Sequence, residues 1–390
     1  MKSLLYLTLT LSAVLSSVCA SSTPFDTTTL SAPDGSISAT FVSFGGTLTS
    51  LLVRNKDGGL ADVVPGYDDN SRLLTDPGHP VMNALVGRYA NRIKNGTFSI
   101  PITKDPQPVG PNVYHTPRND HNGEVRFRLR EASGETDFCG QVTLHGGIYG
   151  WDRRNWTLVS ASPTSVTYQH IDTADEGFPG TVTVTATHTV SNGGILRTAV
   201  NTTATEKTPI MLTQHIYWNL DGFQYGSDDI LGHELHIPEG ERVIEVDGDA
   251  VPTGVLIPVP GTHFDFRKAR RIGAAFEADP QFQGYDNAWV YGSKNGRTAL
   301  WSRLSGIRVD ITTDQPAVQV YTASLNMPRK LVHGGPGKQY GARSTVAIEQ
   351  EGWLDAINTP EWGVDQICES TDDAGREFRW NTEYRFSVLR

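Results

Sequence analysis

The sequence predicts an all-β protein, organised as a large antiparallel sandwich in one domain. Three observations support this fold class: several runs alternate between apolar and polar residues, turn dipeptides separate these runs, and long amphipathic helices are missing. We find no linker and no internal repeat in the 390 residues. Many strands spread evenly over such a length are typical of a large antiparallel sandwich.

The alternation is clearest in the run TVTVTATHTV at residues 181–190. Threonines occupy one face of a strand here, and the other face carries Val182, Val184, Ala186, His188 and Val190. Shorter runs of the same kind lie at 36–42, 47–53, 164–170, 306–312 and 317–322. These runs are predicted strands, and a short helix is compatible only with residues 79–93.

The first twenty residues have the features of a signal peptide. Lys2 gives a positive start, residues 4–18 are almost entirely apolar, Ser or Thr, and Val18-Cys19-Ala20 supplies small residues for cleavage. The alternative, a transmembrane anchor, needs roughly 20 apolar residues, and this stretch is shorter. We therefore expect cleavage after Ala20, which leaves 390 − 20 = 370 residues, 21–390, as one secreted, extracellular domain.

Charge and cysteine content fit a secreted protein. The formal net charge is −10 and the acidic residues are scattered, which argues against nucleic acid and anionic membranes as partners. After cleavage only Cys139 and Cys368 remain, and the sequence leaves open whether they form a disulfide. Three Asn-x-Thr sequons are candidate glycosylation sites, at Asn95, Asn155 and Asn201.

The segment 125–142 does not fit the pattern around it. It is more charged than its neighbours and shows no sustained alternation. One interpretation is a surface loop insertion. The other is translated intron sequence in the gene model, because excision would join two motif halves cleanly. The two interpretations remain open, and the second would remove Cys139 from the protein.

Six clusters combine polar side chains with glycine or aromatic residues, as sugar sites do. They are GRYANRI (87–93), LHGGIYGWD (144–152), QHIYWNL (214–220), GYDNAW (284–289), VQVYT (318–322) and VAIEQEGWLDA (346–356). Taken alone, each cluster is equally compatible with an ordinary structural role, such as a glycine turn beside a buried histidine. The chain lacks the HExxH, P-loop, GxSxG and GxGxxG patterns, so we expect no metal, nucleotide or serine-hydrolase chemistry.

Three of these clusters make specific predictions. A strand over 214–220 would put His215, Tyr217 and Asn219 on one face, next to aromatic residues. In the second cluster Tyr149 and Trp151 are candidates for an apolar wall. In the last, a carboxylate at Glu349 follows a short apolar strand, where it is costly to bury without hydrogen bonds.

Taken together and in order, these clusters resemble the aldose 1-epimerase (galactose mutarotase) family, in its secreted fungal form. The resemblance runs nearly end to end, from GGTLTS (45–50) through GRYANRIKNGTF, LHGGIYGWD, DEGFPG (175–180), QHIYWNL, VPTGVLIPVPGTHFDF (251–266), GYDNAWVY and QVYT to the Glu349 segment. It implies an antiparallel β-supersandwich with a sugar cleft. It also implies interconversion of the α and β anomers of free aldoses by opening and closing of the ring.

The resemblance also implies roles for individual residues. His215 looks like the catalytic acid and Glu349 like the catalytic base. The residues that look like substrate-binding groups are Asn91, Arg92, His145, Tyr217, Asp286 and Gln319. The family chemistry needs neither a metal nor a nucleotide cofactor. We expect a free monosaccharide as the only partner and a monomer or weak dimer.

The sequence departs from the family pattern near the base. The family segment usually reads Glu-x-Gln-x-x-Pro-Asp-Ala, whereas here Glu351 replaces Gln and Leu354 replaces Pro. Gln214 replaces the usual Asn before the acid. If the strand continues past Glu349, Glu351 shares its face and raises its pKa by like-charge repulsion. If the strand ends at Glu349, the two carboxyl groups diverge.

Two other functions remain as alternatives. One is a sugar-binding sandwich without catalysis, against which the intact His215 and Glu349 argue. The other is a polysaccharide hydrolase or lyase on a related fold, with Glu349 and either Asp286 or Glu351 as the acid and base.

Overall fold

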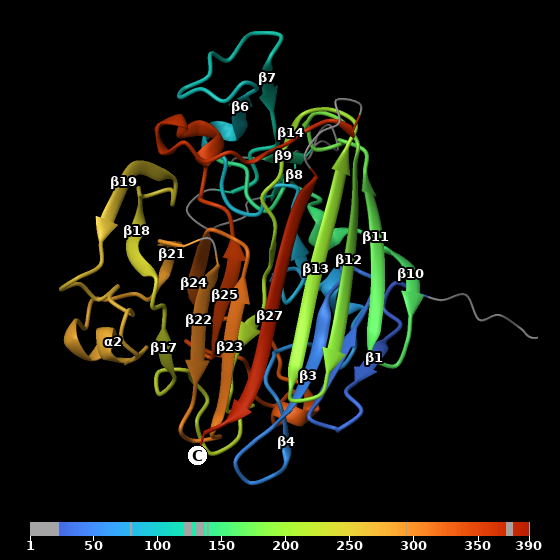
Figure 1. Cartoon of the computed structure of the whole chain (residues 1–390), viewed down its shortest axis with the longest axis vertical. Coiled ribbons are helices and arrows are strands. Elements are labelled where there is room, and N and C mark those ends of the chain that lie inside the picture. The colour runs from blue at the N-terminus through green and yellow to red at the C-terminus, as the bar shows by residue number, and fades with distance from the viewer. Residues whose placement is uncertain are drawn as a thin grey trace, which may run out of the picture.

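The computed structural model describes residues 23–78, 80–120, 140–293, 295–371 and 377–389, with the backbone alone of 127–129 and 136–138. One layer is a nine-stranded antiparallel sheet (Figure 1). Its strands, in spatial order, are β10 (Thr157–Ala161), β11 (Ser165–Asp172), β12 (Val182–Ser191), β13 (Ile195–Ala204), β27 (Phe378–Val388), β23 (Ile307–Thr313), β22 (Gly296–Trp301), β17 (Glu234–His236) and β20 (Arg270–Arg271).

Two further sheets cover one face of the nine-stranded sheet. The larger contains β16 (Tyr217–Trp218), β25 (Thr345–Glu351), β24 (Ala317–Ala323), β21 (Asp286–Tyr291), β18 (Gly240–Val246) and β19 (Pro252–Pro258). The smaller contains β1 (Thr28–Ser31), β2 (Ile37–Phe41), β3 (Leu48–Arg54) and β4 (Leu60–Asp62). Figure 1 shows β1 and β3 behind β12, β13 and β27, and the contacts of β1 with β12 and of β3 with β27 agree with this view.

The remaining elements are short. Two-stranded pairs join β5 (Leu85–Val86) to β15 (Thr213–Gln214), β6 (Thr97–Ser99) to β7 (Val113–His115), β8 (Phe127–Leu129) to β9 (Thr136–Phe138), and β14 (Thr208–Pro209) to β26 (Ile367–Cys368). The described α-helices are α1 (Arg72–Thr75) and α2 (Ala274–Ala278), and the 3-10 turns are Lys94–Gly96, Trp151–Arg153, Leu331–His333, Ala356–Asn358 and Pro360–Trp362. No described helix is long and apolar enough to cross a membrane.

The core lies between the layers and follows the predicted alternation. The face of β12 that carries Val182, Val184 and His188 is buried, and the threonines on the other face are half-buried. On the facing layer, Val346 and Ile348 of β25 join the same core cluster. The predicted strands at 36–42, 47–53, 164–170, 306–312 and 317–322 are confirmed as β2, β3, β11, β23 and β24, and the all-β, single-domain prediction is confirmed with them.

The short helix that residues 79–93 could have held is absent from residue 80 onward. The main chain of this segment bonds to distant segments instead of to its own preceding turn. Leu85 N donates to Gly45 O, Ala90 N to Met211 O and Ile93 N to Thr143 O. We call residues 80–93 the strap, because they run across the sheets and bond to distant segments. The strap brings residues 91–92 over the larger covering sheet.

The last residues of the 125–142 segment bond to the main chain of residues 118–120, and the two interpretations of the segment stay open. Val142 is buried and forms a bridge with Asp120, and Gly140 N donates to Arg118 O. Within the segment, β8 and β9 pair in antiparallel register. The signal peptide and Cys139 lie outside the described residues, so cleavage after Ala20 and a bridge to the buried Cys368 stay predictions.

Candidate active site

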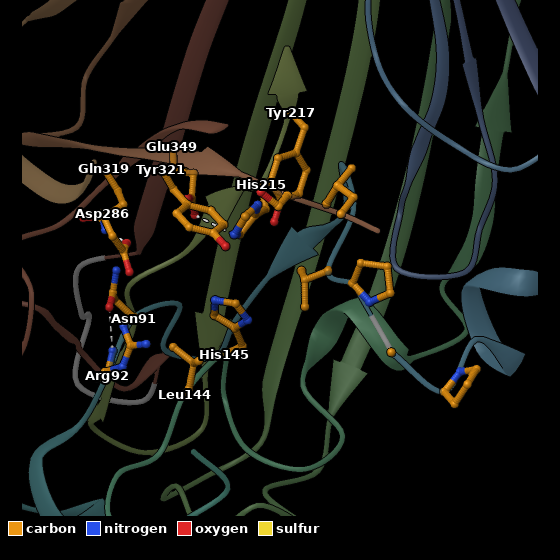
Figure 2. A pocket seen from close by; sticks show the side chains of 16 residues that line it. Asn91, Arg92, Leu144, His145, His215, Tyr217, Asp286, Gln319, Tyr321 and Glu349 are labelled. Atoms are coloured by element: carbon orange, nitrogen blue, oxygen red, sulfur yellow. Dashed lines mark hydrogen bonds and ion pairs between the residues drawn. The ribbon is translucent and has the colours of Figure 1, made fainter. Parts of the chain in front are cut away.

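A cleft of about 540 Å³ opens on the larger covering sheet, on the face turned away from the core (Figure 2). All eight residues predicted for the site line it: Asn91, Arg92, His145, His215, Tyr217, Asp286, Gln319 and Glu349. They come from segments far apart in the sequence, so the fold assembles the site that the motifs indicated.

The alternation of side chains along the strands places the two carboxyl groups of the cleft, Glu349 and Asp286. Along β25, Val346 and Ile348 lie in the core and the Gln350 side chain accepts from Tyr291 of the same core, so Glu349 points the other way. Glu349 pairs in register with Gln319 of β24, which places the two side chains next to each other on the cleft floor. Gln319 Nε2 donates to Asp286 Oδ1 at 2.6 Å, which fixes the carboxylate of β21 at the end of this row.

His215 lies between β15 and β16, where the strand is interrupted. Asn83 forms hydrogen bonds with the main chain of His215 and Tyr217 at this point. His215 N donates to Ala84 O, and His215 O accepts from Asn83 N. The buried Asn83 side chain then accepts from Tyr217 N through Oδ1 at 3.0 Å and donates to Pro65 O. The predicted alternation holds for His215 and Tyr217, which face the cleft, while Gln214 faces inward and accepts from Thr198.

The predicted acid and base are in contact. His215 Nε2 lies 3.4 Å from Glu349 Oε2, and both side chains are almost fully buried. Burial lowers the pKa of His215 to about 4. Burial, followed by the nearby Glu351 and Asp286, raises the pKa of Glu349 well above its usual range, against a smaller opposing effect of Arg92. The protein thus disfavours a charge on either member, and the pair carries a single proton between them.

His145 faces His215 from the glycine-rich loop. Its backbone is left-handed (φ 56°), and the next residue, Gly146, packs so closely that a Cβ there would lie 2.0 Å from Gly87 O. Its ring centroid is 5.4 Å from that of His215 at 79°. Burial, with His215 as a second cause, lowers the pKa of His145 to about 3, so this imidazole is neutral near neutral pH.

Asn119 binds the main chain of the histidine loop. Its Nδ2 donates to Leu144 O at 3.0 Å and to Gly147 O at 2.9 Å, and its Oδ1 accepts from Leu144 N at 2.8 Å. Three hydrogen bonds from one buried amide hold both ends of the His145 turn. No local sequence pattern marks Asn119, because its partners lie 25 and 28 residues further along the chain.

The strap residues Asn91 and Arg92 have buried carboxylate partners. Arg92 Nε donates to Asp120 Oδ2 at 2.9 Å, and Asp120 is completely buried. Asn91 Nδ2 donates to Glu351 Oε1 at 3.2 Å, and Asn91 Oδ1 accepts from Arg92 N.

Strand β25 continues to Glu351, so the first of the two alternatives for this residue is confirmed. Glu351 shares a face of the strand with Glu349 and raises the pKa of Glu349.

Several expectations fail, and some lining residues were missed. Asn219 does not line the cleft but donates to Ser344 O in the interior. Trp151 is buried and donates to Asp172, and Tyr149 is 59% exposed, so neither forms the expected wall. Missed lining residues are Pro77, Gly78, Pro80, Val81, Leu144, Tyr321, Ser324 and Leu325. Of these, Leu144 and Tyr321 lie within the clusters at 144–152 and 318–322, and Tyr321 is two residues after Gln319 on the same strand.

Comparison with known proteins is consistent with this site. A sequence model described as aldose 1-epimerase matches residues 26–385. The chain is 33% identical to a probable aldose 1-epimerase of Arthroderma benhamiae, over 93% of this chain and 87% of that protein. It is 32% identical to the galactose mutarotase of Mus musculus, over 90% and 92%. A crystal structure of a GalM/aldose epimerase homologue from C. elegans superposes with a TM-score of 0.78 at 27% identity, covering 94% and 99%.

Proposed function

The chain belongs to the aldose 1-epimerase family, and we propose that Glu349 and His215 are the base and the acid with which it interconverts the anomers of free aldoses. The enzyme is an isomerase of the mutarotase type. The observation that carries the assignment of roles is the 3.4 Å contact between His215 Nε2 and Glu349 Oε2 inside the cleft. Anomerisation acts on O1 and O5, which are bonded to the same carbon, so its acid and base must be adjacent.

The reaction then proceeds by two coupled proton transfers. The Glu349 carboxylate takes the proton of the O1 hydroxyl, and the O1–H electron pair forms the C1=O1 double bond. The C1–O5 bond breaks, and its electron pair takes a proton from the His215 imidazolium. Rotation about C1–C2 turns the other face of the aldehyde towards O5. Closure returns the O5 proton to His215 and the Glu349 proton to O1, which gives the other anomer.

The buried setting of the pair favours ring opening. Before opening, the pair consists of an imidazolium and a carboxylate, and after opening it consists of a neutral imidazole and a carboxylic acid. Because burial lowers the pKa of His215 and raises that of Glu349, the charged pair is the less stable arrangement of the same proton. The two transfers discharge both groups at once, so both pKa shifts favour the transfers once the charged pair has formed.

The other lining residues fit the binding of sugar hydroxyls and the ring oxygen. The neutral His145, next to His215, is positioned as a hydrogen-bond partner at the ring-oxygen side. Asp286 and Gln319, linked to each other, and Asn91 and Arg92, on the strap, supply paired donors and acceptors for ring hydroxyls. Glu351 does not line the cleft, which argues against a hydrolase that uses Glu349 and Glu351 on opposite sides of a glycosidic bond.

Polarimetry tests this function. Freshly dissolved α-D-galactose or α-D-glucose should lose its initial rotation faster with the protein than in buffer alone. Glu349→Gln should slow that acceleration by about 10²–10⁴-fold, because a general base is lost. Failure of the wild-type protein to accelerate either sugar contradicts the proposal, and binding of sugar without acceleration would favour the non-catalytic alternative.

We further propose that the protein is secreted and glycosylated. Asn95, Asn155 and Asn201 are all exposed, so their amides are accessible to a transferase. Mass spectrometry of the protein collected from culture medium should give an N-terminus at Ser21 and a mass that falls after enzymatic removal of N-glycans. An intracellular protein that starts at Met1 would contradict this proposal.

A further inference from the structure

The motif DEGFPG, residues 175–180, has no task in the proposed reaction, although it belongs to the series of motifs along the chain. It lies in the connection between β11 and β12, and its Glu176 is only 9% exposed. The Glu176 carboxylate accepts two main-chain hydrogen bonds, from Ile148 N through Oε2 at 3.1 Å and from Tyr149 N through Oε1 at 2.7 Å. Glu176 therefore binds two consecutive amides of the histidine loop (residues 144–150).

The carbonyl groups of the same two residues are also bound by side chains. Arg153 Nη1 donates to Ile148 O at 3.0 Å, and Arg154 Nε donates to Tyr149 O at 2.7 Å. Arg154 Nη2 also lies 3.7 Å from Glu176 Oε1. Charged side chains thus satisfy both main-chain groups of Ile148 and Tyr149, which fixes a segment that has no strand partner of its own in the described sheets.

The bound segment packs on the main chain of His145. Gly150 approaches His145 O so closely that no Cβ fits between them. Gly147 approaches Glu176 Oε2 in the same way. His145, Gly146 and Gly147 have positive φ angles of 56°, 82° and 119°. A histidine in the left-handed region is strained, and such a backbone persists only where its surroundings hold it in place.

Glu176 is itself held by the strap. Arg88 of the strap is buried, and its guanidinium lies 2.7 Å from the Asp172 carboxylate at the end of β11. It also donates to Pro179 O at 2.7 Å and to Gly180 O at 3.0 Å. Arg88 therefore binds both ends of the segment that carries Glu176. Through Glu176, the histidine loop is joined to the strap, and both supply residues to the cleft.

We propose that Glu176 is a positioning residue of the reaction, which directs the His145 imidazole towards the ring-oxygen side of the sugar by binding the amides of Ile148 and Tyr149. This inference rests on the proposed function, which places His145 at the ring oxygen. Glu176 does not line the cleft, so it acts through His145 and not on the sugar.

A double-variant comparison of kcat/KM for anomerisation of α-D-galactose tests this dependence. Glu176→Gln keeps the shape of the side chain but turns an NH₂ donor towards one of the two amides. In the wild-type background kcat/KM should fall by about tenfold or more, because small misplacements of a binding group are costly. In a His145→Asn background the same substitution should cost less than about twofold, because the side chain that Glu176 positions is already absent.

Equal losses in the two backgrounds would overturn the inference, because Glu176 would then act on the fold or the cleft by another route. An unchanged kcat/KM in the wild-type background would overturn it as well. Glu176→Asp is a second variant, which keeps the charge but is too short to bind both amides, so it should show the same pattern. Thermal unfolding establishes that each variant is folded.

Asp175→Asn is the matched control. It removes the neighbouring, exposed carboxylate of the same motif, which pairs with Arg154 at 2.9 Å but binds neither amide. We expect it to change kcat/KM by less than about twofold, because exposed ion pairs contribute little. A loss equal to that of Glu176→Gln would contradict the specific role of Glu176.

Hydrogen exchange of the main-chain amides tests the contact without measuring activity. The amides of Ile148 and Tyr149 should exchange about tenfold faster in Glu176→Gln than in the wild type, because a hydrogen bond to a charged group is lost. The Leu144 amide, which donates to Asn119, should change less. Unchanged exchange at residues 148 and 149 would refute the inference. If the wild type failed to accelerate anomerisation while this exchange pattern held, the proposed function would fail and the binding of the loop by Glu176 would stand.

Discussion

His215 and Glu349 are residues whose environment opposes the charge that each needs at the start of the reaction. Because they are in contact at 3.4 Å and buried, they can act as a unit in which Glu349 takes the O1 proton and His215 gives a proton to O5 of the sugar. All eight predicted site residues line the cleft. They could be predicted because each lies in a glycine-rich or polar motif of the sequence. The residues that position them, such as Asn83 and Asn119, were not predicted, because each acts through main-chain atoms of distant segments.

Asp120 gives a test at the residue scale. Asp120→Asn keeps the shape but leaves Arg92 buried without its counterion, which should cost about 3 kcal/mol of unfolding free energy. Arg92 then loses its fixed orientation in the cleft, so KM should rise more than kcat falls. Initial anomerisation rates over a range of sugar concentrations, with denaturant unfolding, measure both effects.

A matched control uses the exposed ion pair of Asp105 with Lys94. Asp105→Asn should change stability by less than about 1 kcal/mol and leave KM unchanged, because exposed pairs contribute little. Equal effects of the two substitutions would contradict the role given to Asp120.

At the scale of elements, strands were predictable where one face is buried. The alternation at 181–190 matches the buried and half-buried faces of β12 because that strand has core on one side only. The strap at 80–93 was not predictable, since its hydrogen bonds go to Gly45, Met211 and Thr143 instead of to its own chain neighbours. Short elements that depend on such partners carry no periodic signal.

Residues 121–139, which include most of the 125–142 segment, give a test at the element scale. Asp120 and Gly140 lie on paired main-chain segments, with Gln141 N donating to Asp120 O at 2.8 Å. Replacement of residues 121–139 by a short glycine linker should therefore preserve Asn119, Asp120 and the cleft, and leave kcat/KM close to that of the full chain. A deletion that also removes Asn119 and Asp120 is the control, and it should lose activity because His145 and Arg92 lose their anchors.

A folded but inactive protein after the shorter deletion would contradict this expectation, and would give residues 121–139 a part in catalysis. Circular dichroism and the cooperativity of thermal unfolding establish whether each deletion variant is folded.

For the whole molecule, the sequence predicted the fold class but not the assembly of the sheets. The partners of β13 in the nine-stranded sheet are β12, its neighbour in sequence, and β27, almost 200 residues away. Local patterns fix which face of a strand is buried, whereas the pairing of distant strands depends on the packing of the complete core. The resemblance to a known family implied the supersandwich architecture, but no pairing of distant strands was predicted.

The buried His188 gives a test of stability at this scale. It stacks on Phe41 with centroids 4.2 Å apart, and burial lowers its pKa to about 3. Between about pH 6.5, the ordinary value, and pH 3, the unfolded chain binds a proton there that the folded protein does not. The free energy of unfolding therefore falls as the pH falls through this window, by up to about 1.4 kcal/mol per pH unit from this residue.

His188→Asn should reduce that slope without abolishing it, because the buried His145 and His215 have lowered pKa values as well; urea unfolding between pH 6.5 and 4 measures the change. Thr198→Val is the control, because it removes the hydrogen-bond partner of His188 but keeps the buried imidazole. It should lower stability without flattening the slope. An unchanged slope in His188→Asn would show that this residue does not contribute to acid sensitivity.

The central claim is that Glu349 and His215 act as one acid–base unit, and a double-variant comparison tests it most directly. Polarimetric kcat values are measured for Glu349→Gln, His215→Asn and the double variant, each verified to be folded. Each single substitution should lower kcat by about 10²–10⁴-fold, and the double variant should be less than about tenfold slower than the worse single variant. Losses that multiply in the double variant, or a single variant with wild-type kcat, would contradict the claim.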